Sequence, residues 1–233
     1  MSTGATATVE TVDLAATSLR DLNSRLHAAG DGSWQIVNPG GRHAIAVGLD
    51  GELAVEIAGH VGYYCAGMNK HADVVVHGNA GVGLAENMMS GTVVVEGDAS
   101  QAAGATAQGG LLVVKGNASA RCAISLKGAD VVVHGSIGHM GAFMAQSGRL
   151  VVCGDAGDAL GDSLYEARLY VRGSVAGLGA DCVEKELREE HLAELRELLE
   201  QAGVQDADPS QFKRYGSART LYTFNVDDAG GYA

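Results

Sequence analysis

The chain has 233 residues, of which 46% are hydrophobic, so it is long enough to bury the core of one sizeable domain or two small ones. Its 16 Lys and Arg face 28 Asp and Glu, a formal net charge of −12 that argues against nucleic acid or an anionic membrane as partner, because both need a basic surface. Nothing resembles a signal peptide, and no apolar run approaches the ~18 residues that span a bilayer. We therefore expect a cytoplasmic protein.

The glycine content is unusual. Glycine occurs 34 times, about twice its usual share of roughly 7%. Only 2 prolines accompany it and no Gly-X-Y period is present, which excludes a collagen-like chain and does not fit a disordered linker. The glycines must therefore serve an ordered structure.

Residues 1–52 are predicted to form an N-terminal cap. The stretch "TSLRDLNSRLHAAG" reads as a helix that begins with a capping box of Ser18 and Asp21, carries a stripe of leucines and stops at Gly30. The segments "WQIV" (34–37) and "HAIAV" (43–47) are then predicted to be two short strands.

A repeat occupies the middle of the chain. The stretch "DVVVHGNAG" (73–81) returns as "DVVVHGSIG" (130–138), an offset of three times 19 residues. One glycine recurs every 19 residues in this region. The positions four and two residues before it are Val, Leu or Ile, as expected for the inward face of a short strand. The repeated glycines are Gly59, Gly78, Gly97, Gly116, Gly135, Gly154 and Gly173.

The spacing of small residues predicts the shape of each repeat. Positions seven residues after each glycine, and thirteen residues after the first six, are Ala or Gly, which divides the period into three near-equal legs with small residues at the corners. The sequence therefore predicts an all-β fold: a single-stranded parallel β-helix over residues 53–181, with about seven three-sided coils and the usual right-handed connection. The repeated glycines are its structural corner glycines.

Two columns beside the glycines are predicted to face outward. The residue after each glycine is always polar or charged, from His60 to Ser174, and should form a polar ladder along the rod. In the column before the glycines, Glu96 should lie between His77 and Lys115 of the adjacent coils.

Residues 182–233 are predicted to cap the other end. Residues 182–201 carry leucines at helical spacing among many glutamates, which indicates an amphipathic helix. Asp208 and Pro209 indicate a short helical turn, and "RTLYTFNV" (219–226) indicates a last extended segment.

No catalytic, cofactor-binding or metal-binding residue is predicted from the sequence. Cys65 and Cys122 share a column but lie three coils apart, about 14 Å at β spacing, which is too far for a disulfide. The four cysteines include no Cys-x-x-Cys, and the eight histidines form no ligand set.

Bulky side chains interrupt the small-residue legs. They have two interpretations that the sequence leaves open: anchors for a protein partner, or filling of the coil interior. Met88 and Leu164 are expected to point inward. The candidate partner-interface residues are Tyr63, Tyr64, Met89, His139, Met140, Phe143, Tyr165 and Tyr215.

Several strings resemble a known family: "VGYYCAGMN", "AENMMSGTVVVEGDASQ", "IGHMGAFMAQSG", "GDAGDALGDSLYEA" and "FKRYGSAR". The chain is similar to the β-helical domain at the C-terminal end of the glutamate synthase large subunit and to the β-helical subunit of formylmethanofuran dehydrogenase. It most resembles the small β-helical subunit of N-methylglutamate synthases. The resemblance spans nearly the whole chain, caps included.

This resemblance implies a non-catalytic scaffold in a complex that converts L-glutamate and methylamine to N-methyl-L-glutamate and ammonia. The implied partners are a class II glutamine amidotransferase-like subunit and an FMN-dependent glutamate synthase-like subunit. FMN and an iron–sulfur cluster would be bound by a partner, with no cofactor on this chain.

Three alternatives remain from the sequence. The chain could serve glutamate synthase proper or formylmethanofuran oxidation. A self-sufficient β-helical enzyme, such as a hexapeptide-repeat acyltransferase or a zinc anhydrase, is disfavoured because those coils have 18 residues rather than 19.

Overall fold

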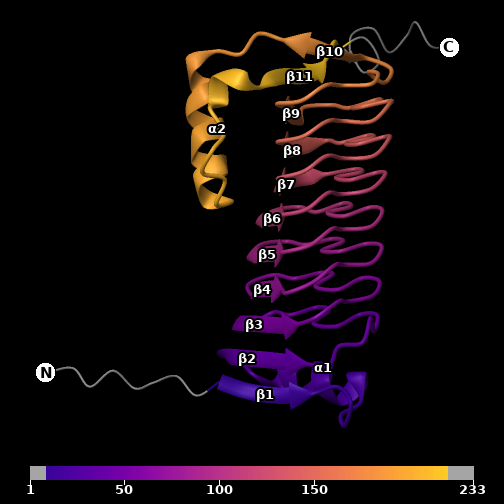
Figure 1. Cartoon of the computed structure of the whole chain (residues 1–233), viewed down its shortest axis with the longest axis vertical. Helices are drawn as coiled ribbons and strands as arrows, with labels where there is room; N and C mark the ends of the chain where they lie inside the picture. Colours follow the sequence, from indigo (N-terminus) through magenta and orange to yellow (C-terminus); the bar gives the residue numbers. More distant parts are fainter. Residues whose placement is uncertain (1–8, 220–233) are drawn as a thin grey trace, which may run out of the picture.

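The computed structural model describes residues 9–219 as a rod of stacked coils with a helix at each end (Figure 1). One sheet of eleven strands runs along it in the order β1-β2-β3-β4-β5-β6-β7-β8-β9-β11-β10. The strands are β1 Val9–Asp13, β2 Asp31–Val37, β3 Glu52–Ala58, β4 Asp73–Val76, β5 Thr92–Val95, β6 Leu111–Val114, β7 Lys127–Val133, β8 Ser147–Val152, β9 Arg168–Val171, β10 Cys182–Lys185 and β11 Lys213–Ser217. The helices are α1 Leu19–Ala28, α2 Glu189–Gln201 and the short 3₁₀ turn Pro209–Gln211.

The strands pair in the register that the repeat predicts. From β3 to β9 every strand pair is parallel and joins residues 19 positions apart, as Val74 pairs with Val93 and Leu112 with Val131. The one exception is Lys127, which pairs with Ser147 beside a register shift at the start of β7. The parallel β-helix is thereby confirmed. The same ladder also continues N-terminally into β2, which pairs with β3 at an offset of 21 residues, and into β1.

The inward columns form a continuous apolar core. The Val, Leu and Ile side chains four and two residues before each repeated glycine are buried along the whole rod. Met88 and Leu164 also point inward, with 0% and 1% of their surface exposed, as expected from their phase. This core of small and branched side chains is what holds neighbouring coils at strand spacing.

Each of the coils that follow the first six repeated glycines contains a leg with an unusual backbone. The residues five, seven and nine positions after the glycine have positive φ, for example Tyr64 (60°), Ala66 (52°) and Met68 (57°). As a result, N–H groups point alternately to the two neighbouring coils: Tyr64 N–H donates to the Val82 oxygen of the next coil and Ala66 N–H to a carbonyl of the previous one. The leg is therefore hydrogen-bonded on both sides without being a strand.

This backbone corrects one expectation. The segment 43–47 is not a strand but the first leg of the same kind, with positive φ at Ala44 and Ala46. Ile45 and Ala46, adjacent in sequence, are both buried, whereas a strand would turn them to opposite faces.

The repeated glycines stack on one another. Gly97 N–H donates to the Gly78 oxygen at 3.0 Å, and the same bond recurs up to Gly173. A Cβ on Gly97 would lie 2.8 Å from the Gly78 oxygen and 2.0 Å from Asn79 Oδ1. Of the seven repeated glycines, Gly59 alone has a positive φ, so at the other six the close approach of the preceding coil, rather than backbone conformation, requires glycine.

Helix α1 closes the N-terminal end of the core. It begins as predicted, with Ser18 Oγ accepting the Asp21 N–H at 3.1 Å. Leu22 and Leu26 are buried and pack in the same apolar cluster as Ile45 of the first leg. The helix therefore covers the side chains that an open coil end would expose.

The C-terminal end departs from the predicted helix over 182–201. Helix α2 starts only at Glu189, because Cys182–Lys185 forms β10. Strand β11 inserts between β9 and β10 and is antiparallel to both. The turn at Asp208 and Pro209 is confirmed, whereas the extended segment expected at 219–226 falls almost entirely outside the described residues.

Helix α2 lies along the outside of the rod, beside the strands nearest its C-terminal end (Figure 1). Leu195, Leu198 and Leu199 pack on the outward column of Val113, Val132, Val151 and Tyr170. His134 Nε2 also donates to the Ala202 oxygen at the end of the helix, at 3.0 Å. Helix α2 and the outer face of the sheet thus enclose a second, smaller hydrophobic core.

Candidate functional site

One wall of the rod carries four of the nine large apolar side chains that are exposed among the described residues. A column of hydrogen bonds through the left-handed legs connects Tyr64 to Val82, Gly83 to Gln101, Ala102 to Ala120, and Arg121 to His139. The residues at the two ends of this column therefore share one wall. We call it the Tyr/Met wall and define it as Tyr63, Tyr64, Met68, His139, Met140, Phe143 and Met144.

The Tyr/Met wall presents two apolar groups to solvent. Tyr63, Tyr64 and Met68 are each 48% exposed, and Met144 is 42% exposed four coils further along. Tyr63 stacks on the ring of His43, with 4.4 Å between centroids. At about 4.8 Å per coil the two groups are roughly 19 Å apart, a span suited to a protein surface rather than a small ligand.

The other candidate interface residues are distributed differently. Met89 and Tyr165 are exposed but belong to a neighbouring column, since their N–H groups donate to Asn69 and Ala145 at the next corner. Tyr215 is a correction: it is 5% exposed, because β11 places it between β9 and β10 with its side chain in the core. Little of its surface is therefore available to a partner.

The predicted polar ladder is present on the rod surface. Each of its side chains accepts the N–H of the ladder residue one coil further on: Asn79 Oδ1 from Asp98, and Asp98 Oδ1 from Asn117, at 2.9 and 2.7 Å. The series starts at His60 and ends at Ser174. The polar ladder therefore links neighbouring coils by hydrogen bonds, and its side-chain acceptors are already bound to backbone N–H groups.

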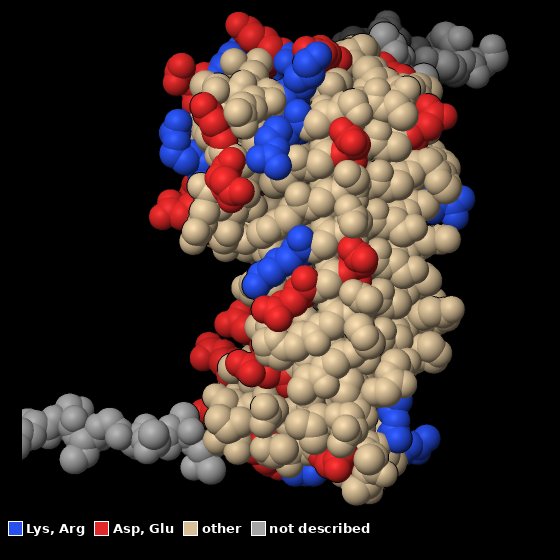
Figure 2. All heavy atoms as spheres, in the orientation of Figure 1, with Lys and Arg blue, Asp and Glu red and all other residues tan. Residues whose placement is uncertain are grey.

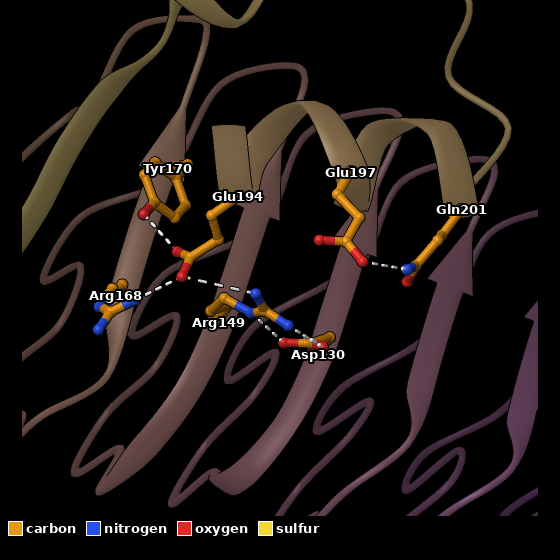
Figure 3. A network of polar contacts seen from close by, with 7 residues as sticks. All are labelled: Asp130, Arg149, Arg168, Tyr170, Glu194, Glu197 and Gln201. Carbon is orange, nitrogen blue, oxygen red and sulfur yellow. Dashed lines mark hydrogen bonds and ion pairs between the residues drawn. The ribbon is translucent and has the colours of Figure 1, made fainter. Parts of the chain in front are cut away.

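An ion-pair network that sequence reasoning missed lies beneath α2 (Figure 3). Arg149 binds both Asp130 oxygens at 2.6 Å and lies 3.5 Å from Glu194 of the helix. Glu194 also pairs with Arg168, and its Oε1 accepts a hydrogen bond from the Tyr170 hydroxyl, with 2.6 Å between the two oxygens. The hydrogen bond to Asp130 raises the pKa of Arg149, so the guanidinium remains charged.

One signal in the sequence could have revealed part of this network. Asp130, Arg149 and Arg168 recur at the 19-residue interval and so occupy one column on successive coils. Two arginines and one aspartate leave a surplus of positive charge in this column, which a second carboxylate would balance. Glu194 of α2 is that carboxylate.

The cysteines do not form a reactive or metal-binding group. All four are free and buried, and burial raises the pKa of Cys65 and of Cys122 to about 12. Such thiols stay protonated at neutral pH, whereas nucleophiles and metal ligands must be thiolates. Across residues 9–219, no three His, Cys, Asp or Glu side chains are grouped so that they could hold a metal ion. The same residues include no helix with the length and apolarity needed to cross a membrane.

Comparison with known proteins identifies the family. No protein-family model matches the chain. The chain is 65% identical over 225 residues to Protein GlxC of Rhizobium meliloti (strain 1021), an alignment that covers 95% of this chain and 99% of that protein. An alignment of this length includes the coils and most of both caps. The chain therefore belongs to the GlxC protein family, and in this member the fold is a parallel β-helix.

Proposed function

We propose that this chain is a non-catalytic scaffold subunit of a glutamate-synthase-like complex, and specifically of an N-methylglutamate synthase. In that complex it docks an amidotransferase-like subunit and a flavin-bearing synthase-like subunit. The reaction of the assembly converts L-glutamate and methylamine to N-methyl-L-glutamate and ammonia.

The observation that carries the proposal is the Tyr/Met wall on a rigid ladder. Large apolar side chains at 40–50% exposure are typical of binding surfaces when they gather on one face, as Tyr64 and Met144 do. The coils behind them are held by hydrogen bonds on both sides, so the wall is preorganised for a partner. Membership of the GlxC family is compatible with a component of a glutamate-synthase-like complex.

The chemistry of the side chains also supports a scaffold role. The four cysteines are dispersed and protonated, a donor set that does not fit an iron–sulfur cluster on this chain. FMN and the cluster accordingly belong, in this proposal, to the synthase-like partner.

Reconstitution tests the proposal directly. The full chain would be purified alone, the two partner subunits together without it, and all three together, and N-methylglutamate formation from glutamate and methylamine would be assayed in each. We expect activity only with all three present. Metal and flavin contents of the assembled complex would be measured in parallel.

Three outcomes would contradict this assignment. Activity of the lone chain would make it an enzyme, and full activity of the two partners without it would remove the scaffold role. Co-purification of molybdenum or tungsten in place of flavin would assign the chain to formylmethanofuran oxidation instead.

A further inference from the structure

A basic cleft opens where the C-terminal cap meets the rod. It has a volume of about 820 Å³ and lies between the N-terminal ends of β7, β8 and β9 on one side and β10, β11 and the start of α2 on the other. Figure 2 shows Lys and Arg side chains gathered among acidic ones near this end of the rod. We call this hollow the cap cleft.

The charge of the cap cleft is opposite to that of the chain. Its walls carry more cations than carboxylates, within a protein of net charge −12. The cations are Arg149, Arg168, Lys185, Arg188, Arg214 and Arg219, and the carboxylates are Asp130, Glu166, Glu186 and Glu194.

All four carboxylates of the cap cleft are already engaged. Asp130 and Glu194 belong to the network beneath α2 that holds Arg149 and Arg168. Glu166 pairs with Arg219 and Glu186 with Arg188, both on the rim. These pairs neutralise four of the cations.

Two cations are left over. Within residues 9–219, neither Lys185 nor Arg214 forms an ion pair. The aliphatic part of the Lys185 side chain lies over Gly216, because a Cβ added to this glycine would be 3.5 Å from Lys185 Cγ. Arg214 Nε donates to the Glu186 carbonyl oxygen at 2.9 Å, which orients the guanidinium. The pKa of Glu186 is lowered mainly by its ion pair with Arg188, and the charge of Arg214 also contributes. Cations outside the ion pairs of a cleft favour an anion.

A buried histidine adds a neutral donor. His191 is 8% exposed, and its Nδ1 accepts the Arg188 N–H at 3.1 Å, so in the neutral ring the proton is on Nε2. Among the described residues no fully buried side-chain nitrogen lacks a partner, and no hydrogen bond engages Nε2, so this atom is accessible, on a residue that lines the cleft. Burial, followed by the nearby Arg214 charge, lowers the pKa of His191, which keeps the ring neutral near pH 7.

We propose that the cap cleft binds a small anion bearing carboxylate or phosphate groups, held by Lys185, Arg214 and the His191 Nε2–H. The cleft volume lies within the range of about 300–1,000 Å³ typical of small-molecule sites. Its walls come from the rod and from the cap, so a ligand would tie the two together. The site does not depend on the proposed complex.

The geometry favours a small molecule over an acidic protein segment. The ion pairs of Glu166 and Glu186 are more than half exposed, whereas Lys185 and Arg214 are half-buried in the same cleft. An acidic peptide would meet the two exposed carboxylates, whereas a compact anion needs to reach only the two half-buried cations.

Titration calorimetry on the full chain tests the site. Inorganic phosphate and pyrophosphate form one arm, and succinate and citrate the other, all at constant ionic strength set with chloride. We expect saturable one-to-one binding in one arm, which identifies the ligand chemistry. The variant Lys185→Gln/Arg214→Gln should weaken it about tenfold or more, because charge-assisted hydrogen bonds are lost.

A matched control removes two cations elsewhere. Arg20→Gln/Lys70→Gln changes the net charge equally but lies far from the cleft at the other end of the sheet, and it should bind like the unaltered chain. Circular dichroism would verify folding, and the single Lys185→Gln variant provides a second, milder perturbation.

Clear results would overturn the proposal. No saturable heat in either arm, or equal weakening in both double variants, would remove the site. Binding of a hexaglutamate peptide by a chain that ignores all four small anions would assign the cap cleft to a protein segment instead.

Discussion

The column of His77, Glu96 and Lys115 shows how stacking gives a surface residue two fixed partners. Glu96 lies 3.1 Å from His77 Nδ1 and 3.2 Å from Lys115 Nζ, on the coils to either side. The hydrogen bond to Glu96 is the main reason why the pKa of His77 is raised, and Glu56 adds a smaller contribution. The pKa of Glu96 is lowered in turn, chiefly by the same bond.

The Glu96→Gln variant should therefore lower the pKa of His77 towards its ordinary value of 6.5. Proton NMR titration of the His77 ring would measure this change. Glu56→Gln is the matched control, since it removes the weaker of the two partners and should shift the pKa less. An unchanged His77 titration in Glu96→Gln would contradict the contact.

The sign of the stability effect follows from the raised pKa of the folded state. Stabilisation from this pair is fully present below the unfolded value of about 6.5, provided that Glu96 is ionised, and is lost as the pH rises through the folded pKa. Because His77 is 39% exposed, solvent screens the pair and the effect on unfolding should be small.

At the scale of the element, the coil depends on the stacked glycines. Gly97→Ala would place a Cβ 2.8 Å from the Gly78 oxygen and against Asn79, so the coils would have to separate. We expect a loss of roughly 1–3 kcal/mol in the free energy of unfolding, measured by urea denaturation.

Gly30→Ala is the control for that substitution. No atom lies within 4 Å of the Cβ it would add, and φ at Gly30 is not positive. Its unfolding free energy should change by only a few tenths of a kcal/mol. Equal losses at the two glycines would mean that conformational freedom, and not the approach of the preceding coil, sets the requirement.

The elements that could be predicted from the sequence are those set by the repeat. A residue such as Val93 meets the same environment as Val74 and Leu112, so one period determines strand, register and inward face together. The strand prediction for 43–47 is wrong because the apolar residues there suit both a strand and a left-handed leg, and only the φ values differ.

The C-terminal cap could not be derived in the same way. Strand β10 exists because β11, about 30 residues later, lies beside it, a long-range pairing that no local pattern encodes. Apolar outward residues such as Val132 are compatible with a covered face, but no local pattern determines which helix covers it. The position of Glu194 over Arg149, and hence the cap cleft, follows only from that docking.

At the scale of the molecule, the cap cleft and the Tyr/Met wall are formed by different parts of the chain. The cap cleft lies where α2, β10 and β11 meet the rod, whereas the Tyr/Met wall follows the left-handed legs. The apolar wall therefore offers a surface for a protein without competing with the anion site. A test of the wall should leave both the fold and the cleft unchanged.

The double variant Tyr64→Asn/Met144→Asn meets this requirement. Both residues have positive φ, at 60° and 52°, a conformation that Asn tolerates better than other non-glycine residues, so the coils should remain intact. Removing two exposed anchors should weaken binding to the partner subunits by about tenfold or more, measured by co-purification and biolayer interferometry.

The matched control is Val9→Asn/Leu178→Asn, which removes two exposed apolar side chains (53% and 42%) from outside the wall. It should assemble normally, because scattered surface hydrophobes contribute little to association. Thermal unfolding of both variants should remain close to that of the unaltered chain. Loss of assembly in the control, or normal assembly of Tyr64→Asn/Met144→Asn, would mean that the partners dock on another face and that the aromatic side chains serve the coil alone.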